Sequence, residues 1–159
     1  MTQTHDLTPL TPAQRANLKA LTDTVLAAVP ERQPAEFWGV AASHMGVDQA
    51  LEHHLNTQLP PATRAGLLGL LDAMAQLSFH AQSQTVRETI LRTVAGIAPE
   101  AAAGVGALRQ LTLMYGYAMP GPDGKNALWP HLAYHGIGSA APQTPKTIRP
   151  TIPAYSELL

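Results

Sequence analysis

The placement of proline divides this chain into two parts that must fold differently. Half of its 14 prolines lie between Pro120 and Pro153, interspersed with four glycines. Proline fixes φ and has no backbone N–H, so such a segment cannot continue a helix or form a central strand. The earlier prolines stand instead at the ends of apolar runs with helical spacing. We therefore expect a helical bundle over residues 1–118 and an extended strap over residues 119–159.

The first half of the bundle has clear helix boundaries. Thr11-Pro12-Ala13-Gln14 is typical of a helix start, because Thr can cap, Pro suits the first turn and Gln can complete a capping box. The apolar run that follows reaches Val29 and is stopped by Pro30. A second helix is predicted over about 34–44, ended by Gly46, and a short third helix over about 48–55, capped by Asp48.

The second half of the bundle continues the same pattern. The segment 61–77 carries leucines on more than one face and is expected to be the central helix. A capping box at Thr85-x-x-Glu88 predicts the next helix, and Pro99 predicts the start of a last helix that reaches Tyr115. No segment alternates as a strand does. The predicted fold is all-α: an irregular bundle of about five to six helices with an extended Pro/Gly-rich C-terminal tail.

Composition narrows the classes of function. Charged residues make up 13% of the chain, against about 25% in typical domains. Such a surface indicates that part of the protein is normally covered by a partner. The ten Lys and Arg residues are scattered, which argues against nucleic-acid binding, and the chain has no cysteine. No apolar stretch is long enough to span a membrane, and the N-terminus lacks the pattern of a secretory signal, so a cytoplasmic location is expected.

Large apolar residues recur in the proline-rich tail, where a solvated linker would carry polar residues. Trp129, Tyr134 and Ile148 are examples, and Arg149 follows the last of them. We expect this tail to lie against a surface, with these four residues as anchors. Tyr115 and Tyr117, which end the last helix next to methionines, belong either to the core of the bundle or to a docking seat for the tail or a partner.

Several short motifs resemble those of catalytic or cofactor sites, but the neighbouring residues that such sites require are missing. Gly136, Gly138 and Ala141 match G-x-G-x-x-A, but no strand precedes them and prolines follow them. Among the histidines, His44, His53, His54, His131 and His135 do not form a metal-ligand pattern. Ser43-His44 and Ser78-Phe79-His80 lack a nucleophile elbow, and the pair Phe37-Trp38 is interpreted as core. We expect no catalytic, cofactor or metal site in this chain.

Two sets of sequence stretches carry a resemblance to a known family. The start "LTPAQRANLKALTDTVLAAVP" resembles the helical module of gluconate dehydrogenase small (gamma) subunits. It also resembles the N-terminal extension of long-chain alcohol oxidases of the glucose-methanol-choline (GMC) oxidoreductase family. In that extension a helix ending in "LTL" plus aromatics leads to an Asn-x-x-Trp-Pro turn, a Tyr-x-Gly step and a Thr-Pro-Lys-x-Ile-Arg-Pro strap. This chain has "LTLMYGYAMPGPDGKNALWPHLAYHGIG" and "TPKTIRP" in the same order, and "FWGVAASHMGVDQALEHHLNTQLPPATRAGLLGLLD" before them.

One departure from the family decides what the resemblance implies. In the long-chain alcohol oxidases the strap runs into the flavin-binding domain, whereas here "TIPAYSELL" follows and no FAD fingerprint is present. The resemblance therefore implies a non-catalytic accessory subunit that binds a FAD-dependent alcohol or sugar oxidoreductase, with FAD held by the large subunit of the hetero-oligomer. Gamma subunits usually carry an export signal, so a periplasmic location stays open. The alternative is a self-contained helical binding protein for an apolar ligand.

Overall fold

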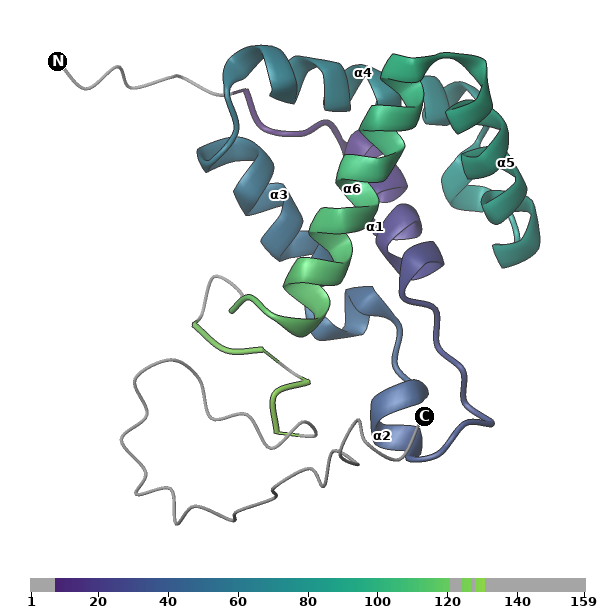
Figure 1. Ribbon diagram of the computed structural model, residues 1–159, viewed down its shortest axis with the longest axis vertical. Helices are drawn as coiled ribbons and strands as arrows, with labels where there is room; N and C mark the ends of the chain where they lie inside the picture. Colours follow the sequence, from purple (N-terminus) through teal and green to yellow (C-terminus); the bar gives the residue numbers. More distant parts are fainter. Residues whose placement is uncertain (1–7, 121–123, 127, 131–159) are drawn as a thin grey trace, which may run out of the picture.

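The computed structural model describes residues 8–120, 124–126 and 128–130. These residues contain α-helices and two short 3₁₀ helices, with no strand among them, which confirms the all-α prediction (Figure 1). In chain order the elements are α1 (Pro12–Val25), α2 (Ala35–Trp38), η1 (Ala42–Met45), α3 (Val47–Thr57), α4 (Pro61–Gln76), η2 (Phe79–Ala81), α5 (Gln84–Ile97) and α6 (Pro99–Tyr117). No helix in this part of the chain is both long enough and apolar enough to cross a bilayer.

Helix α1, rather than α4, is the centre of the bundle. It packs against α3, α4, α5 and α6 and against both 3₁₀ helices. The expectation that the segment 61–77 is central is wrong, because α4 buries a single stripe and leaves its small residues, such as Ala65 and Gly69, exposed. Alanine and glycine satisfy an apolar pattern without needing burial. The fully buried large apolar side chains of the core are Leu18, Leu21, Leu51, Leu55, Leu71, Met74, Phe79 and Leu108.

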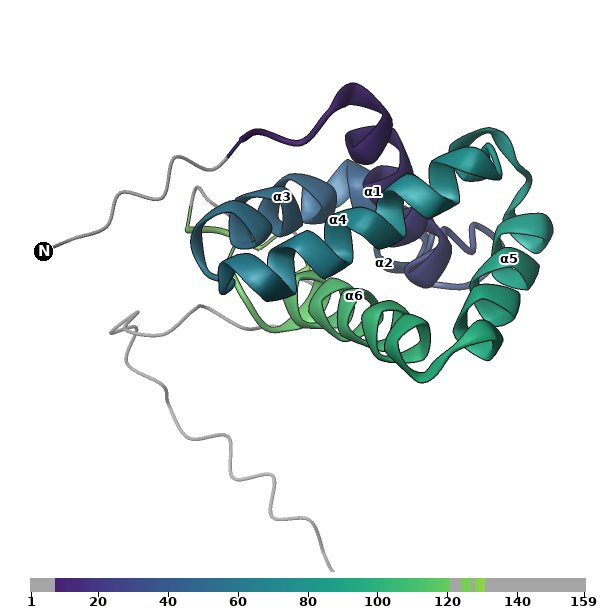
Figure 2. The same ribbon diagram turned by 90° about the horizontal axis from the view of Figure 1, so that it is seen from above.

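Helix α5 lies at the edge of the bundle in both views (Figures 1 and 2). Val94 is its one buried residue, although α5 contacts α6. A helix with so little buried surface contributes less to the core than α1 or α6.

The predicted helix starts were partly right. Thr11 and Gln14 form the expected capping box: Gln14 N donates to Thr11 Oγ1 over 3.2 Å, and Thr11 N donates to Gln14 Oε1 over 2.9 Å. The second predicted box is wrong, because α5 begins one residue before Thr85 and Glu88 instead accepts a hydrogen bond from Gln84 Nε2. Asp48 does not cap α3 either, since Gly46, with φ of 73°, is the residue at its N-cap.

The predicted helix over residues 34–44 is interrupted after Trp38. In a continuous helix Ala42 N would donate to Trp38 O, but it donates to Leu26 O, and Trp38 O accepts from Val29 N. The N–H of Ala42 and the carbonyl of Trp38 therefore both bond to the loop that follows α1. The same exchange ends α1 at Val25, short of the predicted Val29, because Pro30 has no N–H to offer Leu26 O.

Candidate partner-binding surface

The C-terminal end of α6 is closed by a side chain from beyond the helix. The N–H of Met119 bonds to Met114 O instead of Tyr115 O, and Pro120 has no N–H for Gly116 O. Both carbonyls are served by Asn126, whose Nδ2 lies 2.9 Å from Tyr115 O and 3.3 Å from Gly116 O. A third contact joins Asn126 Nδ2 to Met119 O over 2.8 Å. Asn126 thus substitutes for the missing backbone donors of the last turn.

The same asparagine organises the turn that follows. Its Oδ1 accepts a hydrogen bond from Leu128 N over 2.9 Å, and its backbone carbonyl accepts one from Trp129 N over 3.2 Å. Leu128 is 3% exposed and Trp129 is half-buried. The described part of the predicted strap therefore begins as a turn fixed to α6. We call the residues Asn126, Leu128, Trp129 and Pro130 the Asn126 turn.

Tyr115 faces the bundle and is paired with a histidine of α3. Its hydroxyl lies 2.9 Å from His54 Nδ1, and the two rings meet edge to face with centroids 5.5 Å apart. Burial lowers the pKa of His54, with a smaller contribution from neighbouring His53, and burial raises the pKa of Tyr115. Both pKa shifts agree with a neutral His54 whose Nδ1 accepts a hydrogen bond from the hydroxyl of Tyr115. This pair holds α3 against the end of α6.

Tyr117 faces the other way, toward a cluster of aromatic rings. It stacks on Phe37 at a centroid distance of 6.4 Å, and Phe37 meets Trp38 edge to face at 4.8 Å. Arg32 Cζ lies 3.6 Å from the centroid of the Trp38 ring. Phe37 and Trp38 are half-buried and lie outside the main core, and Tyr117 is 36% exposed. We call Arg32, Phe37, Trp38 and Tyr117 the aromatic cluster; α2, which carries two of them, has no buried residue.

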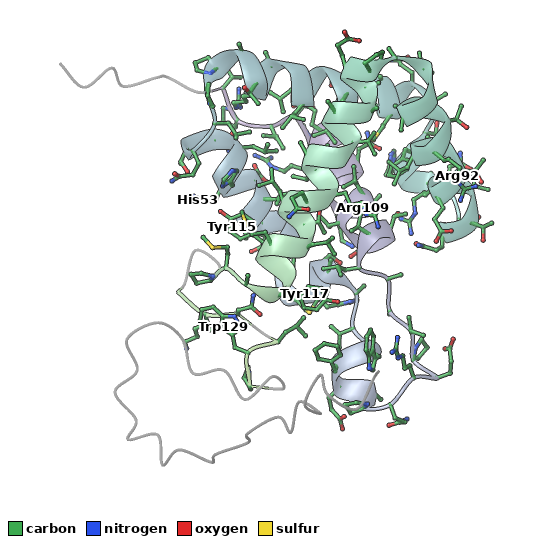
Figure 3. The ribbon with its side chains drawn as sticks, in the orientation of Figure 1. His53, Arg92, Arg109, Tyr115, Tyr117 and Trp129 are labelled. Carbon is green, nitrogen blue, oxygen red and sulfur yellow. The ribbon has the colours of Figure 1, made fainter. Side chains whose placement is uncertain are left out.

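The structure separates the two tyrosines that the sequence grouped. Tyr115 packs against the main core, whereas Tyr117 belongs to the aromatic cluster, and Met119 beyond it is 40% exposed. Figure 3 shows Tyr115, Tyr117 and Trp129 gathered at the same end of α6. The remaining predicted anchors, Tyr134, Ile148 and Arg149, lie outside the described residues, as does the G-x-G-x-x-A stretch.

Sequence reasoning did not single out Asn126 as a residue that acts on α6. The signal was present, because Pro120 stands four residues after Gly116 and so leaves that carbonyl without its helical donor. An asparagine close after such a helix end is a natural substitute donor, since its amide carries two N–H groups. What the sequence could not indicate is that three carbonyls converge on one amide.

Ser43, Asp23 and Lys19 form a polar cluster between α1 and η1. Ser43, considered earlier beside His44, donates from Oγ to Asp23 Oδ2 over 2.9 Å, and its backbone N donates to Asp23 Oδ1 over 2.7 Å. Lys19 Nζ lies 2.9 Å from both Asp23 Oδ2 and Ser43 Oγ. Burial alone would raise the pKa of Asp23, but these hydrogen bonds together lower it. These contacts join α1 to η1.

No group of three or more His, Asp or Glu residues in the described part of the chain is arranged to hold a metal ion. No family model, no curated protein and no solved structure matches this chain.

Proposed function

We propose that this protein is a non-catalytic accessory subunit of a FAD-dependent oxidoreductase of the GMC type. The proposal rests on the resemblance of the tail motifs and on one structural observation, the Asn126 turn. The motif Asn-x-x-Trp-Pro belongs to the resemblance, and its first residue makes four side-chain contacts that fix the start of the strap to α6. A strap that leaves the bundle in a fixed direction suits a docking role, because less conformational entropy is lost on binding.

The aromatic cluster and Met119 supply a surface beside that turn. Tyrosine, tryptophan, methionine and arginine are the residue types enriched at protein interfaces. Half-buried rings held by stacking are already oriented before a partner arrives, which lowers the cost of association. The low charge of the chain, 13%, favours a partner that covers part of its surface.

The experiment co-expresses the tagged chain with a GMC-type flavoprotein from the same genome that lacks the N-terminal helical extension. The flavoprotein, identified by its FAD absorbance, should co-elute with the chain. Trp129→Ala should weaken the complex, and Ser139→Ala, the matched control in the same tail, should not. Circular dichroism checks that each variant keeps its helical content.

Truncation decides which part of the chain binds. A chain ending after Pro130 keeps the Asn126 turn and should still fold, but it should lose most of its affinity for the flavoprotein. Full affinity in that truncated chain would refute the docking role of the strap. Failure of every such flavoprotein of the genome to co-elute would refute the accessory function itself.

A further inference from the structure

A cleft of about 460 Å³ lies between α1, α5 and α6, away from the Asn126 turn. Helices α5 and α6 meet at Ala98 and diverge from there, with α1 between them (Figure 1). The volume falls within the roughly 300–1,000 Å³ typical of small-molecule sites. Five apolar side chains line the cleft: Leu21, Val25, Leu91, Ala95 and Val105.

Two arginines stand at this cleft, Arg92 on α5 and Arg109 on α6 (Figure 3). Among the described residues neither side chain has an ion pair, a hydrogen bond or a ring contact. Glu88 also lines the cleft, but its carboxylate accepts a hydrogen bond from Gln84 Nε2 over 2.8 Å. The cleft thus combines an apolar lining with two cations and one anion, a net charge of one positive unit.

The other polar groups of the lining are already satisfied. The hydroxyl of Thr24 donates to Ala20 O over 2.6 Å, and Thr24 O accepts from Gln84 Nε2 over 3.1 Å. A ligand with many hydroxyls would therefore find few partners here. A guanidinium, by contrast, presents several N–H donors and suits a carboxylate.

We propose that this cleft binds an amphipathic monoanion, an aliphatic chain that ends in a carboxylate. The chain lies along the apolar lining, and the carboxylate takes Arg92 and Arg109. The net charge of one positive unit matches a monoanion better than a doubly charged phosphate. This binding site goes beyond the accessory role, because it needs neither the strap nor the flavoprotein.

The test titrates octanoate, decanoate and octan-1-ol into the isotopically labelled full chain and follows backbone amide shifts by NMR. Decanoate should shift the amides of Ala95 and Val105 and should bind about fifteenfold more tightly than octanoate, since each methylene contributes roughly fourfold. Octan-1-ol should bind several-fold more weakly than octanoate. Arg92→Gln and Arg109→Gln should each weaken decanoate binding by about two- to fivefold, as expected for exposed charge pairs.

Two further variants make the test decisive. Ala95→Phe should fill the cleft and abolish binding of all three probes. Arg15→Gln, which removes an arginine whose partner is Glu52 on α3, is the matched control and should leave decanoate binding unchanged. Equal affinity for octanoate and octan-1-ol would overturn the role of the arginines. Unchanged decanoate affinity in Ala95→Phe would overturn the site, and neither result bears on co-elution with a flavoprotein.

Discussion

Replacing Asn126 by alanine should detach the start of the strap from α6 while leaving the bundle helical. The change removes the donor that serves Tyr115 O, Gly116 O and Met119 O, and the acceptor that serves Leu128 N. No backbone group can take over at Gly116 O, because the N–H four residues on would be that of Pro120. The three carbonyls would have to accept hydrogen bonds from water instead. Leu128 would lose the hydrogen bond from its backbone N–H to Asn126 Oδ1, which holds it in its buried position.

The magnitude follows from the number of bonds that Asn126 can make at one time. Its amide has two N–H groups, so at most two of the three carbonyls are fully served, and Oδ1 adds one accepted bond. Each net hydrogen bond is worth about 0.5–1.5 kcal/mol, and the contact at Met119 is exposed, so the total is about 2 kcal/mol. Each kilocalorie corresponds to roughly 3–6 °C in Tm for a domain of this size.

The assay is thermal unfolding followed by circular dichroism, with amide hydrogen exchange at Leu128 and Trp129 as the local probe. Asn126→Asp is the informative companion, because it keeps the acceptor, loses both donors and places a negative charge at the negative end of a helix. Stability should therefore decrease in the order wild type, Asn126→Ala, Asn126→Asp. Exchange at Trp129 N, which bonds to Asn126 O, should accelerate in both variants.

The measured stabilities of the two variants test whether the bonds donated by Asn126 hold the turn. If Asn126→Asp were as stable as the wild type, the donated bonds to α6 would not be what holds the turn. If Asn126→Ala left both Tm and the exchange at Leu128 unchanged, the turn would be held by other contacts.

Three further predictions concern two glycines of the helices, the pH dependence of stability, and flavin binding. Gly69→Ala should stabilise the protein by about 0.5–1 kcal/mol, because this helical glycine faces open space. Gly116→Ala should stabilise it less, because its new Cβ must displace Leu26 Cδ1, the end of a half-buried side chain. Urea unfolding measures both variants. His54 should make stability depend on pH, because burial lowers its pKa below the ordinary 6.5. This contribution is complete above pH 6.5 and decreases as the pH falls from there toward the folded pKa, so His54→Gln should flatten the curve below pH 6.5. The isolated chain should bind no FAD in a fluorescence titration, and a bound yellow chromophore in the purified protein would contradict this.

Local signals predicted the starts of α1 and α6. The capping box at Thr11 and Gln14 depends on residues three positions apart, and the start of α6 depends on the single proline at its first position, Pro99. The boxes and caps predicted at Thr85 and Asp48 failed within their own elements, whereas the helix predicted over residues 34–44 failed because a distant segment intervened. Leu26 O takes the N–H of Ala42 and so breaks the helix expected over residues 34–44, a contact that no local pattern encodes. Likewise the apolar pattern of α4 predicted burial on several faces, but small residues tolerate exposure.

The buried polar residue Asn17 shows why the centre of the bundle was misassigned. Its Nδ2 donates to Leu71 O and its Oδ1 accepts from His80 N, so it links α1 to α4 and to the loop that carries η2. An asparagine within an apolar run reads as a position facing solvent, yet this one is fully buried. Because its partners lie 54 and 63 residues away, only the tertiary structure reveals α1 as the central helix.

The two proposed sites lie on different elements, so a loss of flavoprotein binding can be distinguished from a loss of decanoate binding. The partner surface depends on the Asn126 turn and the aromatic cluster, and the cleft depends on the middle of α5 and α6. A chain with Ala95→Phe should still co-elute with its flavoprotein, and a chain that ends after Pro130 should still bind decanoate. If the truncated chain lost decanoate, residues 131–159 would take part in the cleft, and the self-contained binding protein would become the better description. If Ala95→Phe abolished co-elution instead, α5 would belong to the partner surface, and the arginines of the cleft would pair with the flavoprotein.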